Sequence, residues 1–226
     1  MNESVVKTLM VSFVICLLCS LVVSFAAVGL RDIQIENKLN DQRIKILQAG
    51  KIYNAEIDVK TQFEDLEVTF PMLRLQEEGA EVIVVGAHPA GQKYTGKYGY
   101  PVKSHVNIED FSSMTVDGLV LPGGFAPDYM RRNKHMLDAI TTSIELGKPC
   151  AAICHGPWMF CSARFPNGQP VCHQRQCTAF VAIKDDLINA GAQFVDAPVV
   201  VDGPLITART PADLIPFCHA LIEALM

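Results

Sequence analysis

Residues 149–157 read PCAAICHGP and are the most informative stretch of the chain. Apolar and small residues lead directly into Cys154, and small residues follow it, a pattern typical of a buried strand that turns sharply into a helix. Such a turn lifts the cysteine above the carboxyl edge of a sheet, where open α/β folds bind ligands. The helix start favours a thiolate, so Cys154 is the candidate nucleophile and His155 its proton partner. The alternative is a buried strand-end cysteine beside a surface histidine.

The sequence around this stretch alternates between strand and helix patterns. Continuous apolar runs predict strands buried on both faces at 81–86, 117–122 and 149–153, with short strands expected around 194–201 and 205–207. Helical spacing of apolar residues predicts helices over 64–78, 126–147, 184–189 and 211–225. This alternation predicts an α/β, flavodoxin-like fold, with a mostly parallel sheet covered by helices on both faces.

The composition excludes several classes of protein. The chain has 226 residues, of which 50% are hydrophobic and 19% charged, too apolar for a disordered protein. Its net charge of −5 argues against a nucleic-acid-binding surface, because phosphate contacts need a basic patch. Its eight cysteines lack regular spacing, so a reactive thiol or isolated buried cysteines are expected in place of a disulfide framework. The mean hydropathy of +0.23 suggests that part of the chain lies in lipid.

Residues 8–30 contain no charged side chain and are flanked by Lys7 and Arg31. A helix of this length spans roughly 34 Å, enough for a bilayer core of about 30 Å. We therefore expect residues 1–30 to be an N-terminal anchor that makes this a single-pass membrane protein. A cleaved signal peptide is the main alternative, although its apolar region usually has roughly 7–15 residues. Lys and Arg are more numerous after the span, which favours a cytoplasmic location for the rest of the chain.

Residues 31–62 are polar and predict a juxtamembrane helix and linker. The first 60 residues resemble the N-terminal membrane anchor of a flavin-carrying subunit of the sodium-translocating NADH:quinone reductase, through the short charged start, the single span and the stretch ENK…ILQAG…IYNAEIDV. That family attaches a flavin to the threonine of a Ser-Gly-Ala-Thr motif, which this chain lacks. The resemblance therefore implies an anchor without flavin, and no cofactor is expected.

Residues 63–226 resemble the PfpI family of cysteine peptidases, glyoxalases and deglycases, which is related to class I glutamine amidotransferases. Six ordered motifs carry the resemblance: FEDLE at 63–67, GKYGYP at 96–101, LPGG at 121–124, AICHGP at 152–157, IKDD at 183–186 with NAG at 189–191, and TARTPADL at 207–214. The resemblance implies that residues 63–226 are one α/β domain with an enzymatic site.

The resemblance also assigns roles to individual residues. It implies that Cys154 is the nucleophile and that Glu64 is the carboxylate that contacts the thiol and shuttles protons. The backbone N–H of Gly124 corresponds to an oxyanion-hole donor, with that of His155, and the His155 side chain to a general base or acid. Asp128 stands where the family usually has a glutamate that reaches the Cys–His pair of a neighbouring subunit, so a homo-oligomer is expected.

Two functions follow for such a site. The chain is expected to act on peptides as a cysteine hydrolase, or on small dicarbonyls and their glycated adducts as a glyoxalase or deglycase. The alternative is a non-catalytic, stress-related or chaperone-like module with a redox-sensing Cys154.

The remaining cysteines suggest no chemistry. Cys172, His173 and Cys177 lack the second pair of ligands that a zinc site needs, so no metal is expected and residues 164–176 are interpreted as an exposed loop. Apolar positions predict that Cys150, Cys161 and Cys218 are small core residues.

One departure from the family concerns the start of the domain. The family has an apolar strand before the position of Glu64, whereas residues 54–63 read NAEIDVKTQF, a poor strand. The chain reads as a fusion at this point, and we expect the first strand of the sheet to be irregular or absent.

Overall fold

The structure is a computed structural model of the chain, and it describes residues 66–96, 99–111 and 116–226 together with scattered positions between 10 and 44. The chain divides into two units, Met1–Ile44 and Lys45–Met226. The described positions of the first unit are almost all helical. Within the described part of the chain, no helix is both long and apolar enough to cross a membrane. The predicted span at 8–30 lies largely outside the described residues.

A four-stranded sheet forms the centre of the second unit. Its strand order is β5 (Leu119–Leu121), β6 (Cys150–Ile153), β10 (Leu205–Ala208) and β9 (Val199–Asp202). The first three strands are parallel, and β9 pairs with β10 in the antiparallel direction. Every residue of β6 and β10 is buried, as the continuous apolar runs predict for central strands.

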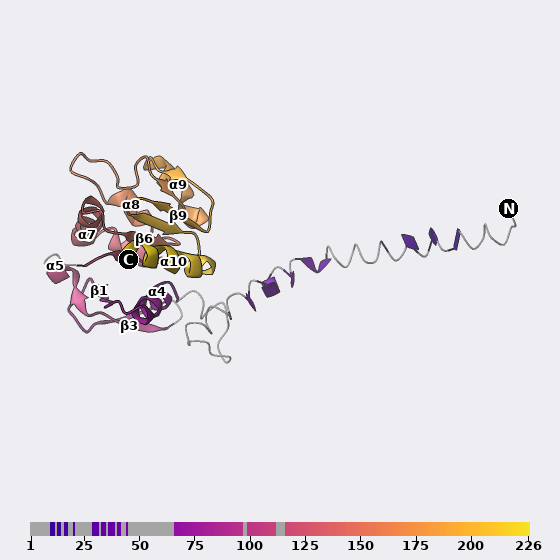
Figure 1. Cartoon of the computed structure of the whole chain (residues 1–226), viewed down its shortest axis with the longest axis horizontal. Helices are drawn as coiled ribbons and strands as arrows, with labels where there is room; N and C mark the ends of the chain where they lie inside the picture. The colour runs from indigo at the N-terminus through magenta and orange to yellow at the C-terminus, as the bar shows by residue number, and fades with distance from the viewer. Residues whose placement is uncertain are drawn as a thin grey trace. The chain divides into compact units, whose positions relative to one another are not determined.

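Helices cover both faces of this sheet (Figure 1). Cys150 and Ala152 of β6 belong to a core that includes residues of α7 (Lys134–Glu145), α8 (Trp158–Ser162) and α9 (Lys184–Asn189). Ala151 and Ile153 belong to a second core with α4 (Leu66–Glu77) and α10 (Leu214–Leu225). Because successive side chains of a strand point to opposite faces, these two cores lie on the two sides of the sheet.

Shorter elements complete the described domain. They are the parallel pair β1 (Val85–Gly86) and β4 (Val106–Asn107), the hairpin of β2 (Lys93–Thr95) and β3 (Pro101–Lys103), the parallel pair β7 (Gln176–Cys177) and β8 (Gln193–Phe194), the helices α5 (Ile108–Phe111) and α6 (Ala126–Met130), and the 3₁₀ turns η1 (Val181–Ile183) and η2 (Pro211–Asp213).

Two predicted elements differ from the structure. The single helix predicted over 126–147 is two helices, because the side chain of Asn133 accepts hydrogen bonds from the backbone N–H groups of His135 and Met136, at 2.9 and 3.3 Å, and so begins α7. The strand predicted over 81–86 is reduced to β1, which pairs only with the short β4 among the described residues. Residues 45–65, which include the poor first strand, are not described.

The prediction of an exposed loop over residues 164–176 is confirmed only in part, because residues 164 and 166–169 are exposed whereas residues 170–172 are buried. Cys172 and Cys177 are fully buried, because the chain folds back after α8 through an antiparallel bridge between Arg164 and Pro170. The loop therefore returns Val171 and Cys172 to the core. Cys150, Cys161 and Cys218 are buried, as predicted.

These buried thiols predict a loss of stability at alkaline pH. Burial raises the pKa of Cys177 and that of Cys218 from 9.0 to about 12. Above pH 9 the unfolded chain therefore binds fewer protons than the folded one, and the free energy of unfolding falls as the pH rises toward the folded pKa. We expect each such thiol to lower the free energy of unfolding by about 1.4 kcal/mol per pH unit between pH 9 and its folded pKa.

Urea denaturation between about pH 8 and about pH 11 measures this effect. The variant Cys218→Ala should show a shallower alkaline decrease than the unsubstituted protein, because one titrating thiol has been removed. An equal decrease in the free energy of unfolding with pH in the two proteins would contradict the prediction.

Candidate active site

Cys154 lies in a sharp turn at the carboxyl end of β6. Its φ of 60° is in the left-handed region, which is rare for a residue with a side chain. Its backbone N–H donates to the carbonyl of Ala208 at 3.0 Å, and its carbonyl accepts from the N–H of Phe180 at 2.9 Å. These bonds hold the strained backbone between β10 and the loop before η1. The strand, turn and short helix have the arrangement that residues 149–157 predict, with Cys154 only 8% exposed.

Glu67 of α4 supplies the carboxylate that contacts the thiol. Its side chain is hydrogen-bonded to Cys154, and the residue is only 6% exposed. Burial, followed by the negative charge and hydrogen bond of Glu67, raises the pKa of Cys154, while hydrogen bonds from the backbone of Gly124 and His155 act in the opposite direction. The resting thiol is therefore protonated. Its hydrogen bond to Glu67 is the path along which the proton can transfer to that carboxylate.

Sequence reasoning named Glu64 for this role and missed Glu67. Glu64 lies outside the described residues. The available signal was the position of Glu67 on α4, because it shares the buried face of the helix with Phe70 and Pro71, three and four residues further along. A carboxylate on an apolar helix face needs a partner, and here that partner is the thiol.

The turn after β5 fits closely against this pair. A Cβ atom at Gly123 would lie 2.5 Å from Oε2 of Glu67, 2.7 Å from Cβ of Cys154 and 2.9 Å from the backbone nitrogen of His155. Real Cβ atoms do not come this close to their neighbours. Only glycine therefore allows β5, the helix that carries Glu67 and the turn that carries Cys154 to meet.

We expect Gly123→Ala to lower turnover strongly and to reduce the free energy of unfolding by roughly 1–3 kcal/mol, because the added methyl group pushes Glu67 away from the thiol. Gly79→Ala is the matched control. Its φ of 87° also strains alanine, but nothing lies within 4 Å of the added Cβ, so this variant should lose stability and keep its activity. Michaelis–Menten kinetics and urea denaturation measure both quantities. Equal loss of activity in the two variants would contradict this account of Gly123.

His155 lies beside the thiol. Its Nδ1 is 3.3 Å from Sγ of Cys154, and its ring packs against Phe180 with 4.9 Å between the ring centroids. Burial lowers the pKa of His155, so the imidazole is neutral at pH 7. Phe180 thus contacts both residues, the cysteine through its backbone N–H and the histidine through its ring.

Gly124 and His155 direct backbone N–H groups at the sulfur. Two such donors suit the oxygen of a carbonyl group that the sulfur has attacked, because negative charge develops there. The structure therefore brings together four groups around Sγ: the two N–H donors, the Glu67 carboxylate and the His155 ring.

Asp128 is placed differently. It lies in the first turn of α6, and its carboxylate forms an ion pair with Arg132. In the part of the chain that the structure describes, no hydrogen bond or ion pair joins Asp128 to Cys154 or His155.

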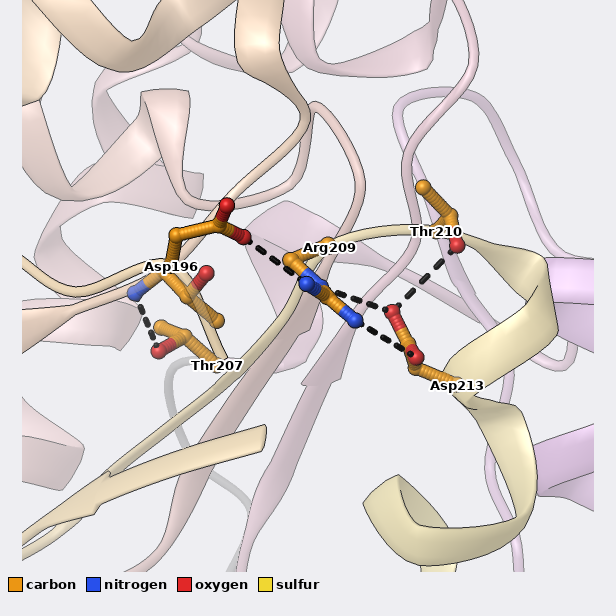
Figure 2. Close-up of polar contacts among 6 residues, drawn as sticks. Asp196, Thr207, Arg209, Thr210 and Asp213 are labelled. Carbon is orange, nitrogen blue, oxygen red and sulfur yellow. Dashed lines mark hydrogen bonds and ion pairs between the residues drawn. The ribbon is translucent and has the colours of Figure 1, made fainter. Parts of the chain in front are cut away.

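An ion-pair network fixes the strand end next to the turn (Figure 2). Arg209 directly follows Ala208, and its guanidinium contacts Asp196 at 2.8 Å and Asp213 at 3.3 and 3.4 Å. The hydroxyl of Thr210 donates to Asp213 at 3.3 Å. The TARTPADL motif thus fixes the end of β10, where the carbonyl of Ala208 accepts the hydrogen bond from the backbone N–H of Cys154. The described residues contain no group of three or more His, Cys, Asp or Glu side chains placed to hold a metal ion.

Comparison with known proteins identifies the domain. Residues 55–224 match the DJ-1/PfpI family. A protein of Pyrococcus horikoshii named deglycase is 40% identical over 164 residues, which are 73% of this chain and 94% of that protein. YraA of Bacillus subtilis, named as a candidate cysteine protease, is 38% identical over 156 residues, 69% of this chain and 88% of its own.

A solved structure supports the same assignment. It is a two-domain protein of Anabaena variabilis with a dj-1/thij/pfpi-like and a ferritin-like domain. The two chains are 37% identical and superpose with a TM-score of 0.65, covering 71% of this chain and 44% of that one. This likeness confirms the predicted flavodoxin-like α/β fold, and together the matches show that the chain belongs to the DJ-1/PfpI family.

Proposed function

We propose that this protein is a cysteine-dependent deglycase that acts on small dicarbonyls and on their adducts with amines. One observation carries the proposal: the Cys154 thiol is hydrogen-bonded to the buried Glu67 and faces two backbone N–H donors. A thiol with an adjacent proton acceptor adds readily to a carbonyl carbon. The relatives named deglycase support this choice of substrate.

The first step forms a bond between sulfur and the aldehyde carbon of methylglyoxal. The thiol proton moves to Glu67, the carbonyl oxygen takes the negative charge beside the N–H groups of Gly124 and His155, and the proton then returns to that oxygen. The product is a hemithioacetal. With a glycated amine, the sulfur displaces nitrogen from the same carbon, and the proton held by Glu67 leaves with the amine.

The second step moves a proton between two carbons. Glu67 removes the proton from the carbon bonded to sulfur and returns it to the adjacent carbonyl carbon. The hydroxyl proton of the hemithioacetal passes to the oxygen of that carbonyl group, and these two proton transfers convert the hemithioacetal into a lactoyl thioester. Water then attacks the thioester carbon, lactate leaves and Cys154 recovers its proton. No oxidant or reductant is needed, since the aldehyde is oxidised by the neighbouring ketone.

Peptide hydrolysis is the second candidate function. It is favoured by the short contact between Sγ of Cys154 and Nδ1 of His155, at 3.3 Å, because a histidine beside the nucleophile can protonate the departing amine. The relationship to YraA supports it as well. The neutral His155, however, carries no proton on one ring nitrogen, and Glu67 is better placed to move the thiol proton.

A parallel assay separates the candidates. Full-length protein in mild detergent is supplied with methylglyoxal, with a methylglyoxal-treated amino acid, or with a fluorogenic peptide. Lactate release from the first two without peptide cleavage is the expected result. Peptide cleavage alone would replace the deglycase proposal by a peptidase, and a thiol that reacts with iodoacetamide but turns over nothing would indicate a redox-sensing module.

We also propose that Asp128 completes the site of a neighbouring subunit in a homo-oligomer. Asp128 lies in the first turn of α6, which begins two residues after Gly124, and its carboxylate is ion-paired to Arg132. Exposed Phe125 and Tyr129 beside it support a contact surface on this helix. Co-refolding Cys154→Ala and Asp128→Ala subunits should restore part of the activity, whereas mixed oligomers without recovery would refute a role in trans.

Residues 8–30 are proposed to hold the protein in a membrane, with the enzymatic domain in the cytoplasm. Their predominantly apolar sequence without a charged residue supports this location. Alkaline carbonate extraction should leave full-length protein in the pellet, and a variant lacking residues 1–31 should be released. A soluble mature product that begins near Ala27 would show instead that the segment is a cleaved signal peptide.

A further inference from the structure

A second group of thiols lies in the other core of the domain. Cys161, Cys172 and Cys177 are buried with residues of α7, α8 and α9, whereas Cys154 belongs to the core formed with α4 and α10. The mechanism proposed above uses none of the three. Their common location raises the question of whether two of them react with each other.

The backbone brings Cys172 back to the end of α8. The N–H of Val171 donates to the carbonyl of Ala163 at 3.0 Å, next to the antiparallel bridge between Arg164 and Pro170. Residues 163 and 171 are thus tied together at the base of a short loop. Cys161 precedes this base by two residues and Cys172 follows it by one.

The side chains meet at the same place. Sγ of Cys172 donates a hydrogen bond to the carbonyl of Phe160, the residue before Cys161, at 3.4 Å. Cys172 is thus close enough to Cys161 to raise the pKa of that thiol by hydrogen bonding. Cys172 is fully buried, while Cys161 is 9% exposed. Two neighbouring thiols can reach the S–S bond length of about 2.05 Å by side-chain rotation.

We propose that Cys161 and Cys172 are a site of reversible disulfide modification, which forms on exposure to a hydroperoxide and fastens the loop after α8 to that helix.

The reaction begins at Cys161. This thiol is the more exposed of the two, and Arg131, which donates to Ser162 at 2.9 Å, favours its thiolate. The thiolate attacks one oxygen of the hydroperoxide, the O–O bond breaks, and a sulfenic acid forms while the other oxygen leaves as water or an alcohol with the proton that Cys161 lost. The sulfur of Cys172 then attacks the sulfenic sulfur, and hydroxide leaves with the Cys172 proton as water. The two thiols supply the two electrons.

The surroundings keep this pair reduced under mild conditions. The hydrogen bond with Cys172 and burial raise the pKa of Cys161, and the negative charge of Asp186 adds to this effect, while Arg131 opposes it. The thiolate is therefore scarce at neutral pH, and the rate of oxidation should rise about tenfold for each pH unit below that pKa.

The disulfide should be visible in stability. It closes a loop between the end of α8 and the core, and this constraint on the unfolded chain should raise the melting temperature by about 5 °C. The candidate active site lies in the other core, so oxidation of this pair alone should leave the Cys154 turn in place.

The test uses full-length protein that is first reduced, then treated with hydrogen peroxide at several pH values and digested without reduction. Mass spectrometry should find a Cys161–Cys172 cross-link whose yield rises with pH and which dithiothreitol removes. The Cys177→Ser variant should form the same cross-link, because Cys177 lies in the same core and has no role in the reaction. The Cys161→Ser variant should lose both the cross-link and the rise in melting temperature.

Three outcomes would overturn the proposal. They are a cross-link from Cys177 to either partner, oxidation of Cys154 with Cys161 and Cys172 still free, and a cross-link that leaves the melting temperature unchanged. The cross-link is mapped by mass spectrometry in the unsubstituted protein, so this measurement tests the proposal even if a variant fails to fold. It is also independent of whether methylglyoxal is a substrate.

Discussion

Replacing Cys154 with alanine is expected to lower lactate formation from methylglyoxal by a factor on the order of 10⁴ or more. No other group can take the place of the thiol, because Sγ is the atom on which the Glu67 carboxylate and the N–H groups of Gly124 and His155 converge. The fold should survive, since alanine leaves the backbone bonds to Ala208 and Phe180 intact. Steady-state lactate assays and circular dichroism measure the two effects.

Cys172→Ala is the matched control for this experiment. It also removes a buried thiol, but from the core on the other side of the sheet, so turnover should change little. Retained activity in Cys154→Ala, or an equal loss in Cys172→Ala, would show that activity does not depend on the thiol in the turn.

The second large effect is expected for Glu67→Gln. Glutamine keeps the size and a hydrogen bond of the side chain but cannot accept the proton of Cys154, so kcat should fall by roughly 10²–10⁴. Iodoacetamide labelling of Cys154 should become easier in this variant at alkaline pH, because removing the nearby negative charge lowers the pKa of the thiol. A structural role alone would not produce this second change.

Glu64→Gln distinguishes the two glutamates of the FEDLE motif. The contact of Glu67 with the thiol predicts that Glu64→Gln keeps most of its activity. If Glu64→Gln loses turnover and Glu67→Gln keeps it, the carboxylate of the site is Glu64, as the family resemblance implies.

Much of the fold follows from local sequence. The apolar run of β6 and the small residues after Cys154 predict a buried strand and a sharp turn, because few other structures accommodate that order of residues. The helix α9 occupies 184–189, as its sequence predicts, and Gly79 with its φ of 87° follows the end of α4. Features of this kind depend on near neighbours in the chain.

The features that sequence reasoning missed depend on distant contacts. Glu64 and Glu67 are three residues apart in one motif, and only the packing of α4 against the Gly123 turn selects Glu67. Cys172 lies among turn-forming residues, and its burial results from the bridge between Arg164 and Pro170. The division between α6 and α7 is made by a single capping side chain within an otherwise helical stretch. Helical periodicity places Glu67 on the buried face of α4 but does not identify its partner. The other two features are not visible in periodicity or composition.

The proposed mechanism depends above all on a covalent bond between Cys154 and the carbonyl carbon of the substrate. Rapid acid quenching of the protein with methylglyoxal, followed by peptide mass spectrometry, detects such a bond. We expect a lactoyl thioester or hemithioacetal on the peptide that contains Cys154, formed within one turnover and consumed as lactate appears, with more of the hemithioacetal in Glu67→Gln. Lactate production with Cys154 unmodified throughout, or with the adduct on another residue, would contradict this mechanism.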